Sequence, residues 1–258
     1  MGWVALKQFL ANHMRKLGEL DISPIGLGTV KFGRNTDVNY RRPFELPSLK
    51  DLRIFLETAR TLGVNFIDTA PAYGASESRL GQLLAHGRHD WIIATKVGEI
   101  YQGGSNYDFS FNHTQLSIET SMKKLRTDYL DIVLVHCSDN DLDNLKNTDV
   151  ISALKGMQEK GYVRYIGAST KTLAGGYYAL DSTDLVMISS APDQIPILET
   201  ARAKNKPSII KKSLKGGFSD NIKGSIQRAL SYPSVVSVVI GSINKQHLKE
   251  NVKHVTSF

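Results

Sequence analysis

Four side chains that could move or stabilise a proton lie at or just after the ends of three apolar runs. Asp68 and Tyr73 belong to the first run, and Lys96 and His136 end the next two. An ammonium beside a buried carboxylate supplies the counter-charge that each group needs. It also favours the phenolate of a nearby tyrosine, so we expect the pKa of Tyr73 to fall below about 10. Such a tyrosine can protonate a developing alkoxide, while His136 hydrogen-bonds the same oxygen and orients the carbonyl.

Each of these residues also has an ordinary structural interpretation. Taken alone, Asp68 is most often a cap or turn residue, Tyr73 part of a turn with the glycine that follows, Lys96 a solvated rim residue and His136 a satisfied core histidine. One such residue would indicate nothing. Four at the ends of three successive runs favour a reaction site.

Apolar runs rich in β-formers alternate with helical patterns along the whole chain. The runs are nearly continuous, which is typical of parallel strands covered on both faces. They span Ile22–Val30, Val64–Thr69, Trp91–Lys96, Leu130–His136, Val163–Ser169, Leu185–Ser189, Pro207–Lys212 and Val235–Ile240. The helical patterns span Leu49–Leu62, Ser76–His86, Thr114–Arg126, Val150–Lys160, Leu173–Leu180, Ile195–Lys204, Ile222–Leu230 and Gln246–Val255.

Eight strand–helix units predict an α/β fold, a closed (β/α)8 TIM barrel, in a single domain over residues 1–258. The C-terminal ends of barrel strands meet at one mouth, so the four side chains above would gather there. The alternative is an open doubly wound sheet. Its dinucleotide fingerprint is absent, because we expect no helix after Gly26-Leu27-Gly28.

Composition excludes several classes of protein. The chain has 258 residues, 41% hydrophobic, and one cysteine, Cys137, which is either a redox-sensitive thiol or, more in keeping with its strand-end place, a buried small residue. No apolar run is long enough for a bilayer and no metal-ligand spacing occurs. The net charge of +7 comes from scattered basic pairs. We expect a cytoplasmic protein, with no membrane, metal or nucleic-acid partner.

The segment from Asp68 to Gly81 (DTAPAYGASESRLG) closely resembles the signature of the aldo-keto reductases. Further similar blocks are RKLG at 15–18, IGLGT at 25–29, IATK at 93–96, TDYLD at 127–131, IGAS at 166–169 and IGS at 240–242 with Glu250-Asn251. STKT at 169–172 and the pair Lys211-Lys212 are most similar to the shorter bacterial members.

The resemblance implies a reductase that transfers a hydride from NADPH to an aldehyde or ketone. Tyr73 would be the general acid, Lys96 and Asp68 would tune it, and His136 would orient the substrate oxygen. The substrate would contact Tyr73, His136 and Tyr101. By the same resemblance, the cofactor would contact Gly28, Thr29, Asp68, Ser169, Thr170, Met187, Lys211, Lys212, Ser213, Leu214, Gly241, Ser242, His247 and Asn251.

Some residues depart from the family pattern. Thr170 and Met187 replace residues that anchor the carboxamide, and Lys211 replaces an aromatic residue. His247 stands where an arginine often holds the 2′-phosphate, so NADH is not excluded as the cofactor. These departures leave an alternative function open, a cofactor-binding redox sensor or scaffold with little turnover.

The chain also has almost no tail after its last helical pattern, where the family has a loop that closes the substrate pocket. The linker Gly98–His113, with Tyr101, is the remaining candidate for a pocket wall. Its other interpretation is a surface loop with partly buried aromatic residues. An open mouth predicts weak selectivity or a lid supplied by a partner. We expect a small carbonyl compound as the substrate, and a monomer or weak homo-oligomer.

Overall fold

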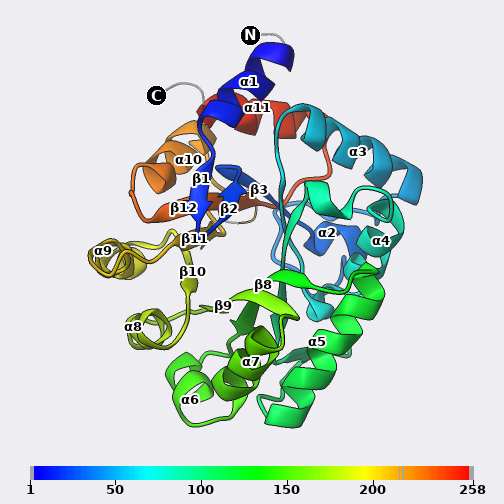
Figure 1. Ribbon diagram of the computed structural model, residues 1–258. Helices are drawn as coiled ribbons and strands as arrows, with labels where there is room; N and C mark the ends of the chain where they lie inside the picture. Colours follow the sequence, from blue (N-terminus) through cyan, green and yellow to red (C-terminus); the bar gives the residue numbers. More distant parts are fainter. Residues whose placement is uncertain (1–2, 215, 217, 256–258) are drawn as a thin grey trace.

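Eight parallel strands close into a barrel in the computed structural model, which describes residues 3–214, 216 and 218–255 (Figure 1). They are β3 Ile25–Gly28, β4 Phe66–Asp68, β5 Ile92–Val97, β8 Leu130–His136, β9 Val163–Ser169, β10 Leu185–Ser189, β11 Ser208–Lys211 and β12 Val235–Ile240. Each pairs with its neighbour in chain order, and β12 closes the ring by pairing with β3. The predicted (β/α)8 barrel is confirmed.

A helix follows every barrel strand and covers the outside of the ring (Figure 1). These helices are α3 Leu49–Thr61, α4 Ser76–Leu83, α5 Phe111–Leu125, α7 Val150–Glu159, α8 Leu173–Ser182, α9 Ile195–Ala203, α10 Ile222–Leu230 and α11 Lys245–Val255. Ser48, Ser110 and Thr172 cap three of them by accepting a backbone N–H with their side chains. Each agrees with a predicted helix to within a few residues.

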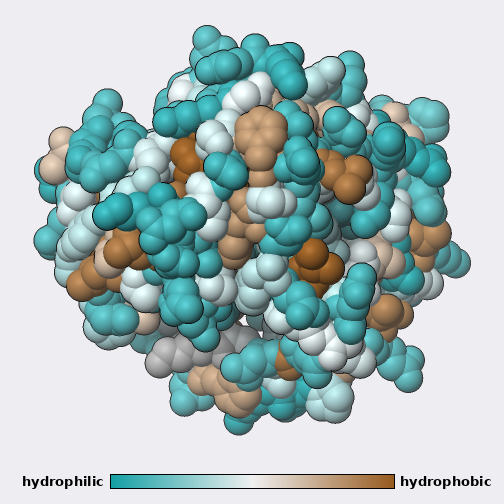
Figure 2. Space-filling view, turned by 90° about the horizontal axis from the view of Figure 1, so that it is seen from below, coloured by the Kyte–Doolittle hydropathy of each residue, from teal (hydrophilic) through white to brown (hydrophobic). Residues whose placement is uncertain are grey.

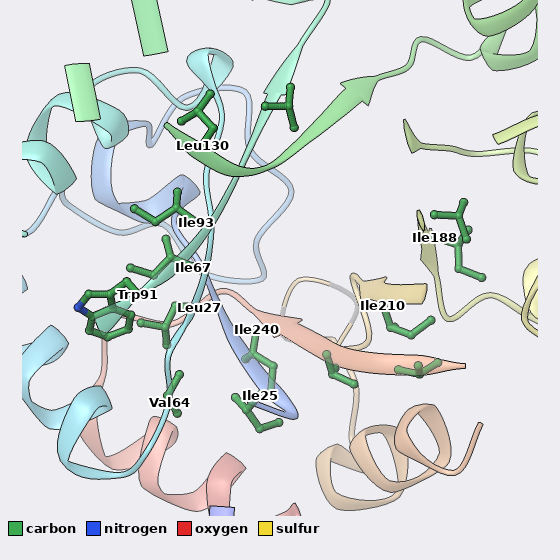
Figure 3. Close-up of a cluster of buried hydrophobic side chains, with 14 of the residues drawn as sticks. Ile25, Leu27, Val64, Ile67, Trp91, Ile93, Leu130, Ile188, Ile210 and Ile240 are labelled. Carbon is green, nitrogen blue, oxygen red and sulfur yellow. The ribbon is translucent and has the colours of Figure 1, made fainter. Parts of the chain in front are cut away.

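Two apolar layers hold the ring together. Side chains at alternate strand positions point outward and pack under the helices, as Ile67, Ile93 and Trp91 do in Figure 3. The intervening positions, such as Phe66 and Ala94, form a separate inner cluster. Because side chains alternate along a strand, the residue two positions beyond an inner residue also points inward. Phe66, Ala94 and Leu134 therefore direct Asp68, Lys96 and His136 into the same mouth.

The N-terminal segment closes the opposite end of the barrel. A hairpin of β1 Arg15–Leu17 and β2 Leu20–Ile22 places Leu17 and Ile22 in the inner cluster. The helix before it, α1 Trp3–Asn12, instead packs outside, where Leu6 and Leu10 join the outer layer. The hairpin is therefore the plug of this end.

Several elements differ from the expectations. The run expected at Ile22–Val30 is divided between β2 and β3, because Pro24 lies between them and has no N–H to offer a strand partner. A four-residue helix, α2 Val30–Gly33, follows β3, so the expectation of no helix there was wrong. The linker Gly98–His113 contains an antiparallel hairpin, β6 Glu99–Tyr101 and β7 Ser105–Tyr107.

Short helices complete the connections. The sequence patterns did not predict α6 Asp141–Lys146 or the 3-10 turns η1 Pro71–Tyr73, η2 Arg88–Asp90 and η3 Pro192–Gln194. Elements of three to six residues carry too few turns to show a periodicity.

One face of the molecule carries mainly polar side chains. In the view of Figure 2 apolar residues occur singly or in small groups between hydrophilic ones. Among the described residues, no helix has the length and apolar character needed to span a membrane.

Candidate active site

A buried ammonium organises the centre of the mouth. Lys96 Nζ lies 2.6 Å from Asp68 Oδ1, 2.8 Å from the carbonyl oxygen of Thr69 and 3.0 Å from Tyr73 Oη. An ammonium has three N–H donors, and here all three are used. The side chains of Lys96 and Asp68 are only 2% and 6% exposed. Tyr73 Oη accepts from Lys96, so its own proton stays available for donation into the mouth.

The backbone around Tyr73 is fixed by its close approach to α2, the short helix that follows β3. Pro71 begins η1 with a preset φ, and Tyr73 N donates to the carbonyl oxygen of Ala70 at 3.0 Å. A Cβ on Gly33 would lie 2.3 Å from Tyr73 O and 2.2 Å from Ser76 N. Only glycine fits there, and the contact holds the tyrosine against α2.

The predicted lowering of the pKa of Tyr73 was wrong. Burial raises this pKa above its usual value, and the opposing effect of the Lys96 ammonium is smaller. The carboxylates of Asp68 and Glu99 raise it further. The phenol therefore stays protonated at neutral pH, which suits a proton donor more than a base.

His136 ends β8 beside the tyrosine, with ring centroids 6.1 Å apart in an edge-to-face arrangement. Its Nδ1 lies 2.6 Å from Glu99 Oε2, and the two side chains are 20% and 10% exposed. Burial lowers the pKa of His136, Lys96 and Lys211 lower it further, and Glu99 opposes them. The sequence prediction missed Glu99. Its only signal was a carboxylate three residues after Lys96, in a segment treated as a linker.

The structure gives the mouth a cover that the sequence did not indicate. The segment 34–41, after α2, begins at Arg34, whose guanidinium donates to Ala72 O at 2.9 Å and stacks 4.1 Å from the ring of Tyr101. It ends across the barrel, where Arg41 N donates to Gly216 O at 3.2 Å. Tyr40 lies over Gly241, and a Cβ there would come within 2.7 Å of its hydroxyl.

This segment changes the interpretation of the mouth and of Tyr101. Burial raises the pKa of Tyr40 to about 12, and the nearby Tyr73 and Asp68 add to this effect. The hydroxyl of Tyr101 contacts Thr36 and Asp37, so Tyr101 secures the segment. The expected open mouth is therefore crossed by residues 34–41 of this chain.

The ends of β9 and β11, and the residues just after them, bring polar groups to the mouth beside the tetrad Asp68, Tyr73, Lys96 and His136. Lys211 Nζ donates to Ser169 Oγ at 2.6 Å. Burial and the adjacent Lys212 lower the pKa of Lys211 to about 7. The hydroxyls of Thr170 and Ser213 are buried and find no hydrogen-bond partner among the described residues. Buried polar atoms without partners are uncommon, and a polar ligand in the mouth would satisfy them.

Other residues of the expected cofactor site have structural roles here. The hydroxyl of Thr29 donates to Asp68 O at 2.9 Å, and Gly28 packs closely on Val239. Met187 is fully buried in the inner cluster. Leu214 packs against the outer layer and is partly buried.

The last expected cofactor residues lie just before α11 and along it. Asn244 Oδ1 accepts the backbone N–H groups of Gln246 and His247 at 2.8 and 3.2 Å. The side chain of Asn251 is on the same helix and buried, whereas that of His247 is exposed. Ser242 Oγ accepts from Asn244 N at 3.1 Å. Polar groups are thus present, but Asn244 already satisfies two donors of the helix start.

Cys137 has the environment of a packing residue. It is 1% exposed, and burial raises the pKa of its thiol to about 12. A thiol that stays protonated is unreactive, so the interpretation as a buried small residue agrees with the structure.

The model of the Aldo/keto reductase family matches residues 24–227. An uncharacterized oxidoreductase of Bacillus subtilis, YqkF, is 36% identical over 60% of this chain and 48% of its own length. The L-galactose dehydrogenase of Arabidopsis thaliana is 33% identical over 66% of this chain and 52% of its own. The chain thus spans about half the length of these curated relatives.

Solved structures match over more of the chain. PA4992 from Pseudomonas aeruginosa is 41% identical, with a TM-score of 0.87, and the match covers 95% of this chain and 94% of that one. The holo form of an aldo-keto reductase from Bacillus halodurans has a TM-score of 0.80 over 95% and 91% of the two chains. At 20% identity, the latter supports the fold alone.

Proposed function

The chain belongs to the aldo/keto reductase family, and on that premise we propose that it reduces an aldehyde or ketone to an alcohol with a hydride from NADPH. The observation that carries the proposal is the fully used Lys96 ammonium. It holds Tyr73 Oη at 3.0 Å while Asp68 balances its charge at 2.6 Å. A phenol held in this way has one proton left to give, and its oxygen is already hydrogen-bonded to a cation that stabilises the phenolate formed by donation.

The chain's own residues divide the work on the substrate. Tyr73 donates its proton to the oxygen of the substrate carbonyl. Lys96 and Asp68 fix the position of the phenol and compensate the charge that remains on it. His136 contacts the same oxygen from the side of β8 and orients the carbonyl.

Ser169, Thr170, Lys211 and Ser213 are the residues of the mouth that best fit a polar cofactor. Thr170 and Ser213 carry buried hydroxyls that have no partner in the part of the chain that the structure describes, and Lys211 brings a cation suited to phosphate or carboxamide groups. When bound, the nicotinamide supplies the hydride. We place the adenosine end near Gly241, Ser242 and Asn251. The exposed His247 provides no built 2′-phosphate site, so the proposed preference for NADPH over NADH needs a direct comparison.

Turnover of both cofactors tests the proposal. We expect the purified full chain to oxidise NADPH in the presence of an aldehyde. Tyr73→Phe should lose about 10²–10⁴-fold in kcat/KM, the usual contribution of a positioned general acid. Tyr177→Phe, which removes a phenol hydroxyl on the outer helix α8, is the matched control and should leave the rate unchanged. Undiminished turnover by Tyr73→Phe would rule out the proton donor.

Two departures at expected cofactor positions favour a second candidate function. Met187 is fully buried in the inner cluster, and the side chain of His247 is exposed. A protein that holds the nicotinamide and the 2′-phosphate with fewer contacts would bind NADPH but turn over little, as a redox sensor or scaffold. NADPH binding followed by intrinsic fluorescence, with no turnover over a broad aldehyde panel, would favour this candidate.

A further inference from the structure

Lysines at the mouth differ in whether a carboxylate balances their charge. Lys96, in β5, pairs with Asp68 at 2.6 Å. Lys171, just after β9, pairs with Asp139 at 2.7 Å. Lys211 ends β11, and no carboxylate in the part of the chain that the structure describes lies within ion-pair distance of its Nζ. Lys211 thus differs from both in lacking a counter-charge within the described chain.

The surroundings of Lys211 disfavour its charged form. Burial is the largest cause of its pKa of about 7. The cations that face it, Lys212, Lys96 and Lys171, lower the pKa as well, and Cys137 opposes them. At neutral pH about half of the Lys211 side chains are therefore uncharged amines. A lysine that is desolvated beside other cations is an arrangement that activates an amine as a nucleophile.

The hydrogen bond of Lys211 with Ser169 leaves the lone pair of the amine free. Nζ donates to Ser169 Oγ at 2.6 Å, so Ser169 holds Nζ through one of its N–H groups. Lys211 is partly exposed, so a small molecule in the mouth can reach it. The charge of Lys211 also lowers the pKa of His136, which places Lys211 among the groups around the tetrad. A neutral amine with a free lone pair attacks the carbon of a carbonyl group.

We propose that Lys211 binds small aldehydes covalently, as an imine on Nζ. The inference rests on the proposed function for its class of ligand, but it needs no hydride transfer. The lone pair of Nζ attacks the carbonyl carbon, and both hydrogens of the amine leave with the carbonyl oxygen as water. A C=N bond replaces the C=O bond, so nothing is oxidised or reduced and no co-reactant is needed.

Reductive trapping shows which lysine forms the imine. The full chain is incubated at neutral pH with propanal and cyanoborohydride, which fixes each imine as a propyl group, and the peptides of the digested protein are examined by mass spectrometry. Lys171 is the matched control, because the effect of burial on its pKa is outweighed, chiefly by Asp139, and the pKa is raised. With a pKa of about 7, Lys211 has about 10³-fold more uncharged amine than an ordinary lysine, an advantage partly offset because weaker bases are weaker nucleophiles. We expect Lys211 to be labelled at least about 10-fold faster than Lys171, and equal labelling of the two would overturn the inference.

The pH dependence of the labelling is a second measurement on the wild type. The ratio of the Lys211 rate to the Lys171 rate cancels the effect of pH on the reagents. This ratio should fall above about pH 8, because Lys211 is then almost fully uncharged and only Lys171 continues to gain uncharged amine. A ratio that does not change with pH would contradict the proposal.

Lys211→Arg tests the assignment on the intact protein. The variant keeps a cation at the end of β11 but has no amine to form an imine, so the fast label should disappear. Lys223→Arg, which changes an exposed lysine of the outer helix α10, should keep it. A fast label that persists in Lys211→Arg would belong to another lysine and would overturn the inference. If Lys211→Arg does not fold, the wild-type peptides still decide.

The two proposals fail in different ways. If Lys211 is labelled fast but the chain oxidises NADPH with no aldehyde, the proposed function fails and the reactive lysine stands. Turnover of NADPH without a fast label on Lys211 has the opposite meaning.

Discussion

Removal of Lys96 is the perturbation whose effect on stability follows most directly from the structure. The ammonium and Asp68 are 2.6 Å apart and almost fully buried. Lys96→Met keeps the length of the side chain but leaves a carboxylate buried without a counter-charge. Breaking a buried pair in this way costs about 3–5 kcal/mol. For a chain of this size, that corresponds to a fall in Tm of about 6–20 °C.

The assay is a double-mutant cycle followed by urea unfolding. Asp68→Asn combined with Lys96→Met removes both charges, so we expect the double variant to be more stable than Lys96→Met alone. The exposed pair Lys16–Asp21, 2.8 Å apart, is the control, and Lys16→Met should cost at most about 1 kcal/mol. If Lys96→Met unfolds within 1 kcal/mol of the wild type, or if the two losses simply add, the pair does not have the role assigned here.

Further predictions concern the backbone of the mouth and its lysine. Gly33→Ala should lose about 1–3 kcal/mol of stability in a urea titration and lower the turnover rate, because its Cβ would meet Tyr73 O. Gly104→Ala is the control. Its Cβ would enter open space, so this variant should stay within about 0.5 kcal/mol of the wild type in the same titration. The pKa of Lys211 is about 7 in the folded chain and about 10.4 in the unfolded chain. Between these two pH values the unfolded chain binds more protons than the folded chain. The free energy of unfolding of the wild type should therefore rise with pH over this range. Lys211→Met should remove up to about 1.4 kcal/mol of this rise per pH unit, and parallel curves for the two proteins would show that the folded chain does not disfavour the ammonium.

The strands and the tetrad could be predicted from the sequence for the same physical reason. Strands covered on both faces leave continuous apolar runs, and the ends of parallel strands meet. A polar residue that ends such a run, as Lys96 and His136 do, therefore has a predictable neighbourhood. The alternation that points both side chains inward follows from the period of the strand.

What the sequence did not predict depends on non-local contacts. Glu99 meets His136 only because a hairpin forms directly after β5, and that pairing leaves no apolar pattern. The segment of Arg34 and Tyr40 is polar and irregular, so its path across the mouth depends on distant partners such as Gly216. The predicted direction of the pKa shift of Tyr73 was wrong. The effect of burial outweighs that of the nearby ammonium, and the depth of burial cannot be predicted from the positions of the strand ends.

Isotopically labelled cofactor tests whether Tyr73 protonates a carbonyl oxygen as the carbonyl carbon receives a hydride. NADPH carrying deuterium at both C4 positions of the nicotinamide is incubated with the full chain and an aldehyde, and the alcohol is examined by mass spectrometry and NMR. We expect one deuterium on the carbinol carbon, and the same label at a rate about 10²–10⁴-fold lower for Tyr73→Phe. An alcohol without deuterium, with the label in water, or an undiminished rate for Tyr73→Phe would contradict it.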